Sequence, residues 1–265
     1  MNSIEGYNPV TNEFNRRAES YDRFAYVQRI AAEEVAQIVE NFSHLLANPS
    51  ILELGSGTGF LTEHLVQRFP DHQIYATDIS ERMIDILREK IGFHRNLETH
   101  VLDANTLSGD FSTIGCVVSG FTLQWLSNPA ESVHQWLKSI HPNGFAVLSW
   151  LGEGSFQEWR NMAAMSGVSY TGNALPGEEI VDRIRCRAEL DIIDYRIEHK
   201  PLQFDSAISF FKTIRNIGAS TEMNPSKENR NLLRLCKHWD EKSPQGVSVG
   251  HELHYLVLRK SNSNR

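Results

Sequence analysis

The sequence is poor in cysteine and has no long apolar run. Its three cysteines, Cys116, Cys186 and Cys236, lie far apart and form no C-x-x-C pair, a pattern that excludes a disulfide framework and a zinc knuckle. No stretch reaches the roughly 18 consecutive apolar residues that a membrane-spanning helix needs. Residues 1–19 also lack the apolar segment of a secretory signal. These absences predict a cytoplasmic protein without a bound metal or a membrane partner.

An excess of basic residues is missing as well. The chain has 26 Lys and Arg against 33 Asp and Glu, for a net charge of −7. Nonspecific binding to nucleic acid needs a basic surface that neutralises phosphates, so nucleic acid is not an expected partner. With 265 residues, of which 40% are hydrophobic, the chain can bury a core and is not a low-complexity sequence. Its length predicts one elaborated α/β core, or a core with an inserted cap.

Short apolar runs alternate with helix-like stretches between residues 50 and 151. This alternation is typical of a parallel sheet connected by crossover helices, so we expect a doubly wound sheet. We predict its strands at 51–54, 73–77, 97–102, 116–119 and 145–150. We predict its helices at 58–69, 81–90 and 130–140, after an amphipathic helix at 29–46.

The regular alternation weakens after the fifth strand. A helix is expected at 178–187, followed by a strand at 192–204 that Pro201 interrupts. Residues 251–260 predict a last strand, and its apolar residues are too continuous for an exposed sheet edge. The intervening residues 205–250 are far too many for a hairpin turn, and we interpret them as a helical cap inserted over the sheet.

The strongest local signal is a glycine-rich turn at the end of the first strand. Glu53, Gly55, Gly57 and Gly59 stand there at alternate positions before a helix begins. Glycine lets the backbone turn tightly and approach a ligand closely, because a side chain at these positions would obstruct it. Ligands of open α/β sheets bind at this place, beyond the carboxyl ends of the strands. A glycine loop alone is also compatible with a simple strand-to-helix turn.

Two further acids end the neighbouring strands. Asp78 closes the second strand about twenty residues after the glycines, where a carboxylate can accept hydrogen bonds from both hydroxyls of a ribose. Asp103 ends the third strand in the same way. Either residue alone is more readily explained as a helix cap, whereas three acids in register over one crevice are not.

The glycines and acids together argue against a dinucleotide cofactor. A G-x-G-x-x-G loop seats pyrophosphate on a helix N-terminus, but here the third glycine comes one residue early and Glu53 places negative charge before the loop. Negative charge repels pyrophosphate. It suits a ligand with ribose hydroxyls, an ammonium and a sulfonium, which are the groups of S-adenosyl-L-methionine.

At these positions the sequence resembles the class I methyltransferases, which use S-adenosyl-L-methionine. The glycine turn matches their first motif, Asp78 their ribose acid, and Asp103 the residue near the adenine edge. Met83, in the second motif, is expected against the adenine, although it also fits a helix residue that faces the core. The cofactor-binding residues that this resemblance implies are Glu53, Gly55, Gly57, Gly59, Asp78, Ile79, Met83, Asp103 and Ala104.

A second resemblance is more specific and spans nearly the whole chain. It covers a segment upstream of the sheet, the loops after the fourth and fifth strands, and parts of the C-terminal half. There the sequence is similar to the malonyl-acyl-carrier-protein O-methyltransferases of biotin biosynthesis. The matching segments are residues 14–22, 123–125, 154–156, 175–180 and 211–219.

This resemblance implies an α/β, Rossmann-like methyltransferase fold, with a doubly wound, mostly parallel seven-stranded sheet and an inserted helical cap. It implies four regions: an N-terminal helical lid at 1–46, the cofactor-binding core at 47–204, the cap at 205–250, and the final strand and tail at 251–265. We expect the protein to act as a monomer.

The implied reaction converts the free carboxylate of malonyl-acyl-carrier protein to its methyl ester and releases S-adenosyl-L-homocysteine. A carboxylate is ionised at neutral pH, so its attack on the methyl group needs no general base. Tyr21 is expected to close over the methionine end of the cofactor, and Trp125 to exclude water or contact the sulfonium. Gln124 is expected beside the substrate. Tyr21 and Trp125 also fit structural residues packed on the sheet.

The negative charge of the acceptor is expected to meet basic residues in the cap. Residues 206–239 contain six basic and two acidic side chains, a net charge of +4. Carrier proteins are acidic, so we interpret this segment as a docking surface that steers the encounter, although charged helix faces also occur without a partner. Lys212 or Arg215 either belongs to that surface or pairs with the malonyl carboxylate.

Three alternative functions remain open on the sequence alone. A carboxyl methyltransferase of a free small acid, such as a tricarboxylate, would not depend on the basic cap. A noncatalytic module would bind the cofactor and a protein partner without transferring a methyl group. A nicotinamide dehydrogenase would be stabilised by NAD and not by S-adenosyl-L-homocysteine.

Overall fold

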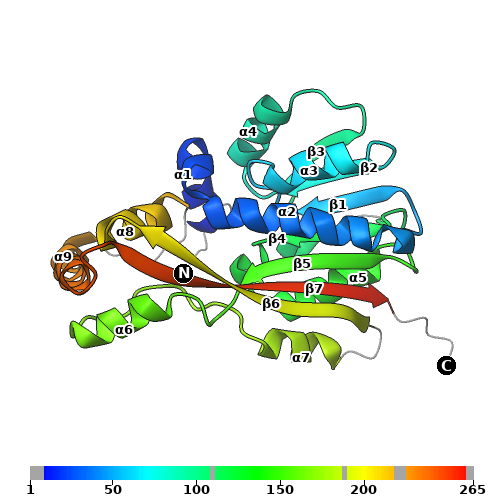
Figure 1. Ribbon diagram of the computed structural model, residues 1–265. Helices are drawn as coiled ribbons and strands as arrows, with labels where there is room; N and C mark the ends of the chain where they lie inside the picture. Colours follow the sequence, from blue (N-terminus) through cyan, green and yellow to red (C-terminus); the bar gives the residue numbers. More distant parts are fainter. Residues whose placement is uncertain (1–8, 108–110, 187–189, 218–224, 261–265) are drawn as a thin grey trace, which may run out of the picture.

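The computed structural model describes residues 9–107, 111–186, 190–217 and 225–260. Its centre is a sheet of seven strands in the order β3-β2-β1-β4-β5-β7-β6 (Figure 1). Strands β1 to β5 run parallel, and β7 pairs antiparallel with both β5 and β6. The predicted α/β class with a mostly parallel sheet is confirmed. The strands are β1 (Ser50–Leu54), β2 (Gln73–Asp78), β3 (Leu97–Val101), β4 (Cys116–Gly120), β5 (Phe145–Leu151), β6 (Leu190–Phe204) and β7 (Val247–Lys260).

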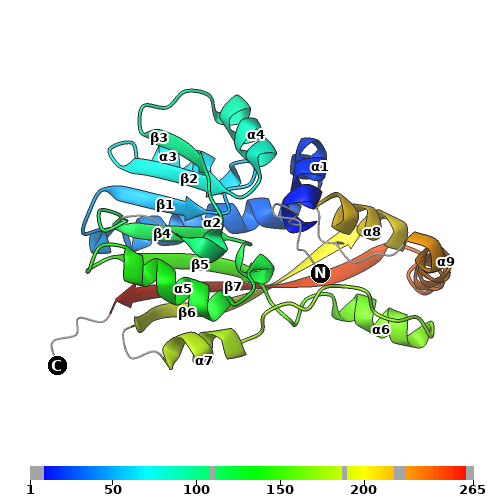
Figure 2. The ribbon, with the colours of Figure 1, turned by 180° about the vertical axis from the view of Figure 1, so that it is seen from behind.

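Helices cover both faces of the sheet (Figure 1, Figure 2). Alternate side chains of a strand point to opposite faces, so Ile51 belongs to the core that includes α2 and α3, and Leu52 to the core that includes α5 and α7. Among the helices that the structure describes, none combines the length and the apolar composition of a membrane-spanning segment. The helices are α1 (Pro9–Phe24), α2 (Tyr26–Asn41), α3 (Phe60–Arg68), α4 (Glu81–Ile91), α5 (Pro129–Ser139), α6 (Gln157–Met165), α7 (Glu179–Arg185), α8 (Ala207–Asn216) and α9 (Pro225–Lys242), with 3₁₀ turns η1 (Ser43–Leu45), η2 (Ala104–Thr106) and η3 (Leu123–Trp125).

The parallel half of the sheet follows the sequence prediction closely. All five predicted strands are present, and α2 to α5 lie where helices are expected, with shifted ends. Helix α6 is not predicted from the sequence, because its buried residues Trp159, Met162 and Ala163 form only one short apolar stripe.

Strands β6 and β7 form a long antiparallel ribbon that extends past the other strands (Figure 1). The predicted interruption at Pro201 is wrong, because β6 is continuous and Pro201 pairs with Gly250. Strand β6 lies at the edge of the sheet, where a residue without a backbone N–H is tolerated. Strand β7 starts at Val247, earlier than predicted, and lies between β5 and β6. The prediction that the last strand is not an exposed edge is therefore confirmed.

Helices α8 and α9 fall between β6 and β7 in the sequence. They lie at the far end of the ribbon, beyond the carboxyl ends of the parallel strands rather than flat on a face of the sheet (Figure 1, Figure 2). Helix α8 packs against α1 and β6, and α9 packs against α6 and α8. Part of the predicted cap, residues 218–224, lies outside the described residues. The division into lid, core, cap and final strand remains a prediction.

Candidate active site

A cavity of about 300 Å³ lies at the carboxyl ends of the parallel strands. We call it the glycine-loop cavity. Small-molecule sites in proteins occupy about 300–1,000 Å³, so its volume falls at the lower end of their range. The residues predicted from the sequence that line it are Tyr21, Gly55, Gly57, Asp78, Ile79, Met83, Asp103, Ala104 and Trp125.

The glycine loop after β1 forms one wall of this cavity. Gly55 and Gly57 have φ angles of 75° and 53°, in the left-handed region that favours glycine. A Cβ at Gly55 would lie 2.0 Å from Oγ1 of Thr122, so a side chain would collide with the loop that follows β4. A Cβ at Gly57 would meet no described atom within 4 Å. A side chain at Gly57 would instead take up open space beside the cavity.

Asp78, the last residue of β2, faces the cavity and holds the glycine loop. Its Oδ2 accepts a hydrogen bond from the backbone N–H of Gly57 (2.9 Å), and its Oδ1 accepts one from that of Ser80 (2.8 Å). Burial raises the pKa of the Asp78 carboxyl, and the hydrogen bonds from Ser80, Gly57 and Ile79 oppose that rise. Each carboxylate oxygen has a further lone pair. Asp78 can therefore accept hydrogen bonds from hydroxyl groups of a ligand while it still binds the loop.

Glu53 and Gly59 are predicted site residues that lie behind the loop and do not line the cavity. Glu53 is 1% exposed and accepts a hydrogen bond from Oγ1 of Thr62 (2.7 Å). Burial raises the pKa of Glu53 to about 8; the bond from Thr62 lowers it, and the charge of Asp78 raises it. Gly59 lets α3 approach α4, because a Cβ there would lie 2.8 Å from Cγ of Leu87. Glu53 is therefore tied to α3, and Gly59 permits the contact between α3 and α4.

Asp103 both lines the cavity and caps a turn. Its Oδ1 accepts hydrogen bonds from the backbone N–H (2.8 Å) and the side-chain amide (3.0 Å) of Asn105, which makes it the cap of η2. The carbonyl of Ala104 accepts a hydrogen bond from Nε1 of Trp136 (2.8 Å), which ties η2 to α5. The two interpretations of Asp103 are thus compatible.

The cavity that the two aspartates line also has an apolar wall. This wall is formed by Ile79, Met83 and Leu102, and Met83 is only 1% exposed. The side chain of Ser80 caps α4 by accepting a hydrogen bond from the backbone N–H of Met83 (3.1 Å). This wall and η2 line the same cavity and offer it an apolar surface of the kind that a flat group such as a nucleobase packs against.

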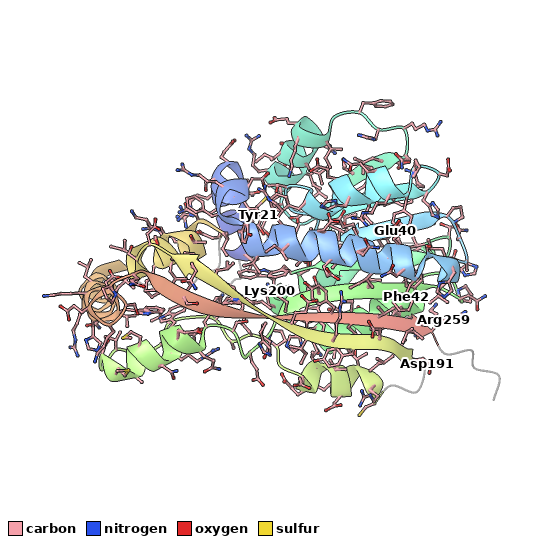
Figure 3. The ribbon with its side chains drawn as sticks, viewed as in Figure 1. Tyr21, Glu40, Phe42, Asp191, Lys200 and Arg259 are labelled. Carbon is pink, nitrogen blue, oxygen red and sulfur yellow. The ribbon has the colours of Figure 1, made fainter. Side chains whose placement is uncertain are left out.

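Helix α1 covers the cavity and contributes Phe14 and Tyr21 to its lining. Tyr21 lies near the C-terminal end of α1, beside the carboxyl edge of the sheet (Figure 3). Polar pairs join this helix to the loop after β1 and to α4, both of which border the cavity. They are Asn15 with Ser80 (2.6 Å), Asp22 with Thr58, Asp22 with Lys90 (3.1 Å), and Glu19 with Arg82.

Four aromatic residues separate the glycine-loop cavity from a second, smaller pocket. Phe14, Tyr21, Phe121 and Trp125 line both, and the rings of Phe14 and Trp125 meet edge to face with centroids 5.1 Å apart. Burial raises the pKa of Tyr21, and the negative charges of Asp78 and Asp22 raise it further. The phenol is therefore neutral at physiological pH and can donate a hydrogen bond.

The second pocket, which we call the aromatic pocket, has a volume of about 60 Å³ and is lined by Gln124. The Oε1 atom of Gln124 is buried without a hydrogen-bond partner among the described residues. Lys212 and Arg215, the other predicted substrate residues, are exposed on α8 and line none of the cavities described for this part of the chain. Their positions fit a docking surface better than direct contact with a substrate carboxylate.

Sequence reasoning missed two residues that border these cavities. Phe121 follows β4 and Phe156 precedes α6, and both have positive φ angles, 59° and 63°. Such strain persists where the surrounding structure fixes it, and it is concentrated at functional sites. Phe121 lines both the glycine-loop cavity and the aromatic pocket, and Phe156 lines the aromatic pocket. Nothing in the sequence marks a phenylalanine for this conformation.

The arrangement can hold a nucleoside with a positively charged substituent. It offers a carboxylate for ribose, an apolar wall for a base, and aromatic rings where it adjoins the aromatic pocket. Within the described residues, no group of three or more His, Cys, Asp or Glu side chains is placed to hold a metal ion.

Comparison with known proteins agrees with this arrangement. A family model described as a methyltransferase domain matches residues 51–144. A malonyl-[acyl-carrier protein] O-methyltransferase of Bacillus cytotoxicus is 31% identical to this chain, covering 97% of it and 93% of the relative. A biotin biosynthesis bifunctional protein BioHC of Teredinibacter turnerae is 27% identical over 95% of this chain, which spans only 46% of that relative's length.

Solved structures share the fold. A putative methyltransferase of Bacillus halodurans superposes with a TM-score of 0.59 and 13% identity, covering 83% of this chain and 97% of its own. A phosphoethanolamine N-methyltransferase 2 of Haemonchus contortus, in complex with S-adenosyl-L-methionine, has a TM-score of 0.52 and 14% identity, covering 87% and 53%. At these identities the likeness concerns the fold alone.

Proposed function

The chain belongs to the malonyl-[acyl-carrier protein] O-methyltransferase family, and from this premise we propose that it methylates the free carboxylate of malonyl-acyl-carrier protein in biotin biosynthesis. One carboxylate oxygen forms a bond to the methyl carbon while the sulfur–methyl bond breaks. The electron pair stays on sulfur, and the products are a methyl ester and S-adenosyl-L-homocysteine. The observation that carries the proposal is a cavity lined by the predicted cofactor residues and joined through aromatic side chains to a second pocket.

The residues of the glycine-loop cavity fit S-adenosyl-L-methionine, which when bound supplies a methyl group on a positively charged sulfur. Asp78 would hold the ribose hydroxyls, because its two oxygens face the cavity with lone pairs to spare. Met83 and Ile79 would pack against the adenine, with Asp103 at its edge. The buried carboxylate of Asp78 gives this end of the sheet a negative potential that favours a cation, and Glu53 adds to it when it loses its proton.

Tyr21 and Trp125 stand between the cofactor and the acceptor. Trp125 excludes water and offers a ring face to a cation. The neutral phenol of Tyr21 can donate a hydrogen bond to the acceptor carboxylate, and the amide of Gln124 can donate another from the aromatic pocket.

The chain's contribution to the rate is positioning. The acceptor is already ionised at neutral pH, so no side chain has to remove a proton and no metal is needed to generate the nucleophile. Holding the two reactants in line can supply about 7–11 kcal/mol in well-oriented systems. We therefore expect variants of the aromatic partition to change kcat more than cofactor affinity.

The test is an incubation of the purified protein with methyl-labelled S-adenosyl-L-methionine and one acceptor at a time. The acceptors are malonyl-acyl-carrier protein, malonyl-coenzyme A, free malonate and a tricarboxylate. Mass spectrometry should find a base-labile methyl ester on the malonyl carrier. Label on a free acid alone would instead identify a small-acid carboxyl methyltransferase, and tight cofactor binding without label on any acceptor would identify a noncatalytic module.

A further inference from the structure

Two further cavities border the aromatic pocket, and each has exposed residues in its lining. One, of about 450 Å³, shares Gln28, Phe121, Phe156 and Ile214 with the pocket; we call it the apolar channel. The other, of about 650 Å³, shares Gly172, Asn173 and Leu175 with it; we call it the acidic cleft. A substrate that is tethered to a carrier protein needs one open route to the reacting centre, so the two cavities are competing routes.

The acidic cleft has the wrong charge for an anionic substrate. Glu153, Glu178 and Glu252 line it together with one cation, Arg160. Partial burial alone would raise the pKa of Glu252, but hydrogen bonds from His254 and the backbone of Gly154 hold it below its ordinary value. Glu252 is therefore ionised at neutral pH.

Arg160, the single cation of the acidic cleft, already has partners within the protein. The guanidinium of Arg160 donates a hydrogen bond to the carbonyl of Ser155 and lies over the ring of Tyr170, 4.8 Å from its centroid. It therefore offsets only part of the negative charge that the three carboxylates place there.

The apolar channel has the opposite character. Its walls come from α2, α8 and the end of β6, and exposed Arg23 and Tyr26 stand at its outer end. Among its described lining residues Arg23 carries the only charge at neutral pH, because burial lowers the pKa of His251. Arg23 has no ion-pair partner within the described part of the chain. Its guanidinium carbon lies 5.7 Å from the ring centroid of Phe24.

The lining of the channel combines apolar side chains with uncharged polar groups. Leu202, Phe204 and Ile217 supply the first, and Gln28 and Thr213 supply the second. Phe121 and Phe156, the two residues with positive φ, line the channel where it borders the aromatic pocket. A chain that carries both amides and a branched alkyl segment matches this mixed lining.

We propose that the apolar channel binds the phosphopantetheine arm of the acyl carrier protein, with Arg23 facing the phosphodiester at its outer end. This inference rests on the proposed function and specifies the route by which its substrate reaches the cofactor. The arm is a run of amides and alkyl groups that begins at a negative phosphodiester, so its charge fits the channel and is repelled by the acidic cleft. The thioester end then reaches the aromatic pocket, and the malonyl carboxylate faces Tyr21.

A matched pair of filling substitutions separates the two routes. Thr213 lines only the apolar channel, and Ala174 lines only the acidic cleft, among the cavities of the described residues. Thr213→Trp should lower kcat/KM for malonyl-carrier by at least about tenfold. The Kd for S-adenosyl-L-homocysteine should stay within about twofold of the unmodified protein. Ala174→Trp should leave both values near those of the unmodified protein.

If Thr213→Trp fails to fold, as judged by its melting curve with S-adenosyl-L-homocysteine, Gln203→Trp fills the same channel from an exposed position on β6. Loss of activity in Ala174→Trp with normal activity in the channel variants would overturn the inference in favour of the acidic cleft. Normal activity in all of them would overturn it as well. If the unmodified protein forms no ester on malonyl-carrier, the proposed function fails first and the channel loses its proposed occupant.

A charge reversal tests the outer end of the channel. Arg23→Glu should raise KM for malonyl-carrier and malonyl-coenzyme A about threefold to fivefold, as an exposed ion pair allows. KM for malonyl-N-acetylcysteamine should not change, because that thioester lacks the phosphate. Arg95→Glu is the matched control, since Arg95 is exposed and lines none of the cavities of the described residues. Equal effects of Arg23→Glu on all three thioesters would contradict a phosphate contact.

Discussion

The two halves of the site are built by different means. In the cofactor half, the side chain of Asp78 accepts hydrogen bonds from the backbone N–H of Gly57 in the glycine loop and from that of Ser80, and glycines with positive φ supply the turn. In the acceptor half, apolar side chains from α1, α2, α6, α8 and the β6–β7 ribbon surround the aromatic pocket and the channel. The cofactor half depends on a few fixed contacts, whereas the acceptor half depends on shape. Single substitutions should therefore have larger effects in the first half than in the second.

The largest effect is expected at the glycine loop. Gly55→Ala places a Cβ 2.0 Å from Thr122 and should weaken S-adenosyl-L-homocysteine binding about a hundredfold or more, as measured by calorimetry. Gly92→Ala is the control, because Gly92 also has a positive φ (73°) but lies in open space away from the cavity. Gly92→Ala should lower the melting temperature without a comparable loss of affinity. Normal binding by Gly55→Ala would show that the loop does not need glycine.

The next effect is expected at Asp78. In Asp78→Asn the side-chain amide would face the backbone N–H donors of Gly57 and Ser80. The substitution also removes the negative charge that strengthens hydrogen bonds from the ribose hydroxyls. A hydrogen bond to a charged group contributes about 1.5–3 kcal/mol, so affinity should fall about tenfold to a hundredfold. Asp103→Asn should have a smaller effect in the same titration, since Asp103 is half-exposed. The reverse order would exchange the roles of the two acids.

In the acceptor half, Tyr21→Phe should lower kcat about tenfold, equivalent to about 1.4 kcal/mol in the barrier. The Kd for S-adenosyl-L-homocysteine should not change. Tyr75→Phe removes a hydroxyl from β2 outside the described cavities and serves as the control. Trp125→Ala should also lower turnover while the fold stays intact. Unchanged rates in both Tyr21→Phe and Trp125→Ala would remove these residues from the site.

The dependence on pH should reveal the buried acid behind the loop. The pKa of Glu53 is raised from 4.5 to about 8 in the cofactor-free protein, and a bound cation favours the ionised form. Binding of S-adenosyl-L-methionine should therefore release a proton, and affinity should rise from pH 6.5 to about pH 8 and then level off. Calorimetry in buffers of different ionisation enthalpy measures this release. Glu53→Gln should flatten the profile; an unchanged profile would assign it to another group.

The same shift predicts a stability effect of opposite sign. The folded state binds the Glu53 proton more tightly than the unfolded state, so this residue's contribution to the free energy of unfolding is fully present below about pH 4.5 and is lost as pH rises to about 8. In denaturant titrations without cofactor, Glu53→Gln should lack this loss.

The smallest effect is expected on the exposed face of α8. The double variant Lys212→Glu with Arg215→Glu should raise KM for malonyl-carrier a few-fold with little change in kcat, because rim charges mainly steer encounter. The rise should shrink at high salt. Arg95→Glu with Arg185→Glu makes the same change of charge elsewhere on the surface. An equal effect of both pairs would mean that only the net charge matters.

The sequence predicts the cofactor half of the site better than the acceptor half. The cofactor half could be predicted because its signals are local: glycines at alternate positions, and acids at the ends of β2 and β3. The acceptor half is assembled from segments far apart in the chain, so the sequence indicates Gln124 and Trp125 but not their surroundings. The positive φ of Phe121 and Phe156 is imposed by tertiary packing, and no residue type marks it in advance.

The placement of the basic cap residues had to come from the structure. The sequence shows that Lys212 and Arg215 belong to a basic segment. Only the fold shows that both are exposed and line none of the cavities of the described residues. In the same way Pro201 suggests a break, and only its edge position explains why β6 continues through it.

The most direct measurement of the central claim is a crystal structure of the protein with S-adenosyl-L-homocysteine. The ribose hydroxyls should bind Asp78, the adenine should lie against Met83, and the sulfur should point toward Tyr21 and Trp125. A ligand bound elsewhere, or a glycine-loop cavity filled by side chains of α1 while the ligand is absent from it, would contradict the claim.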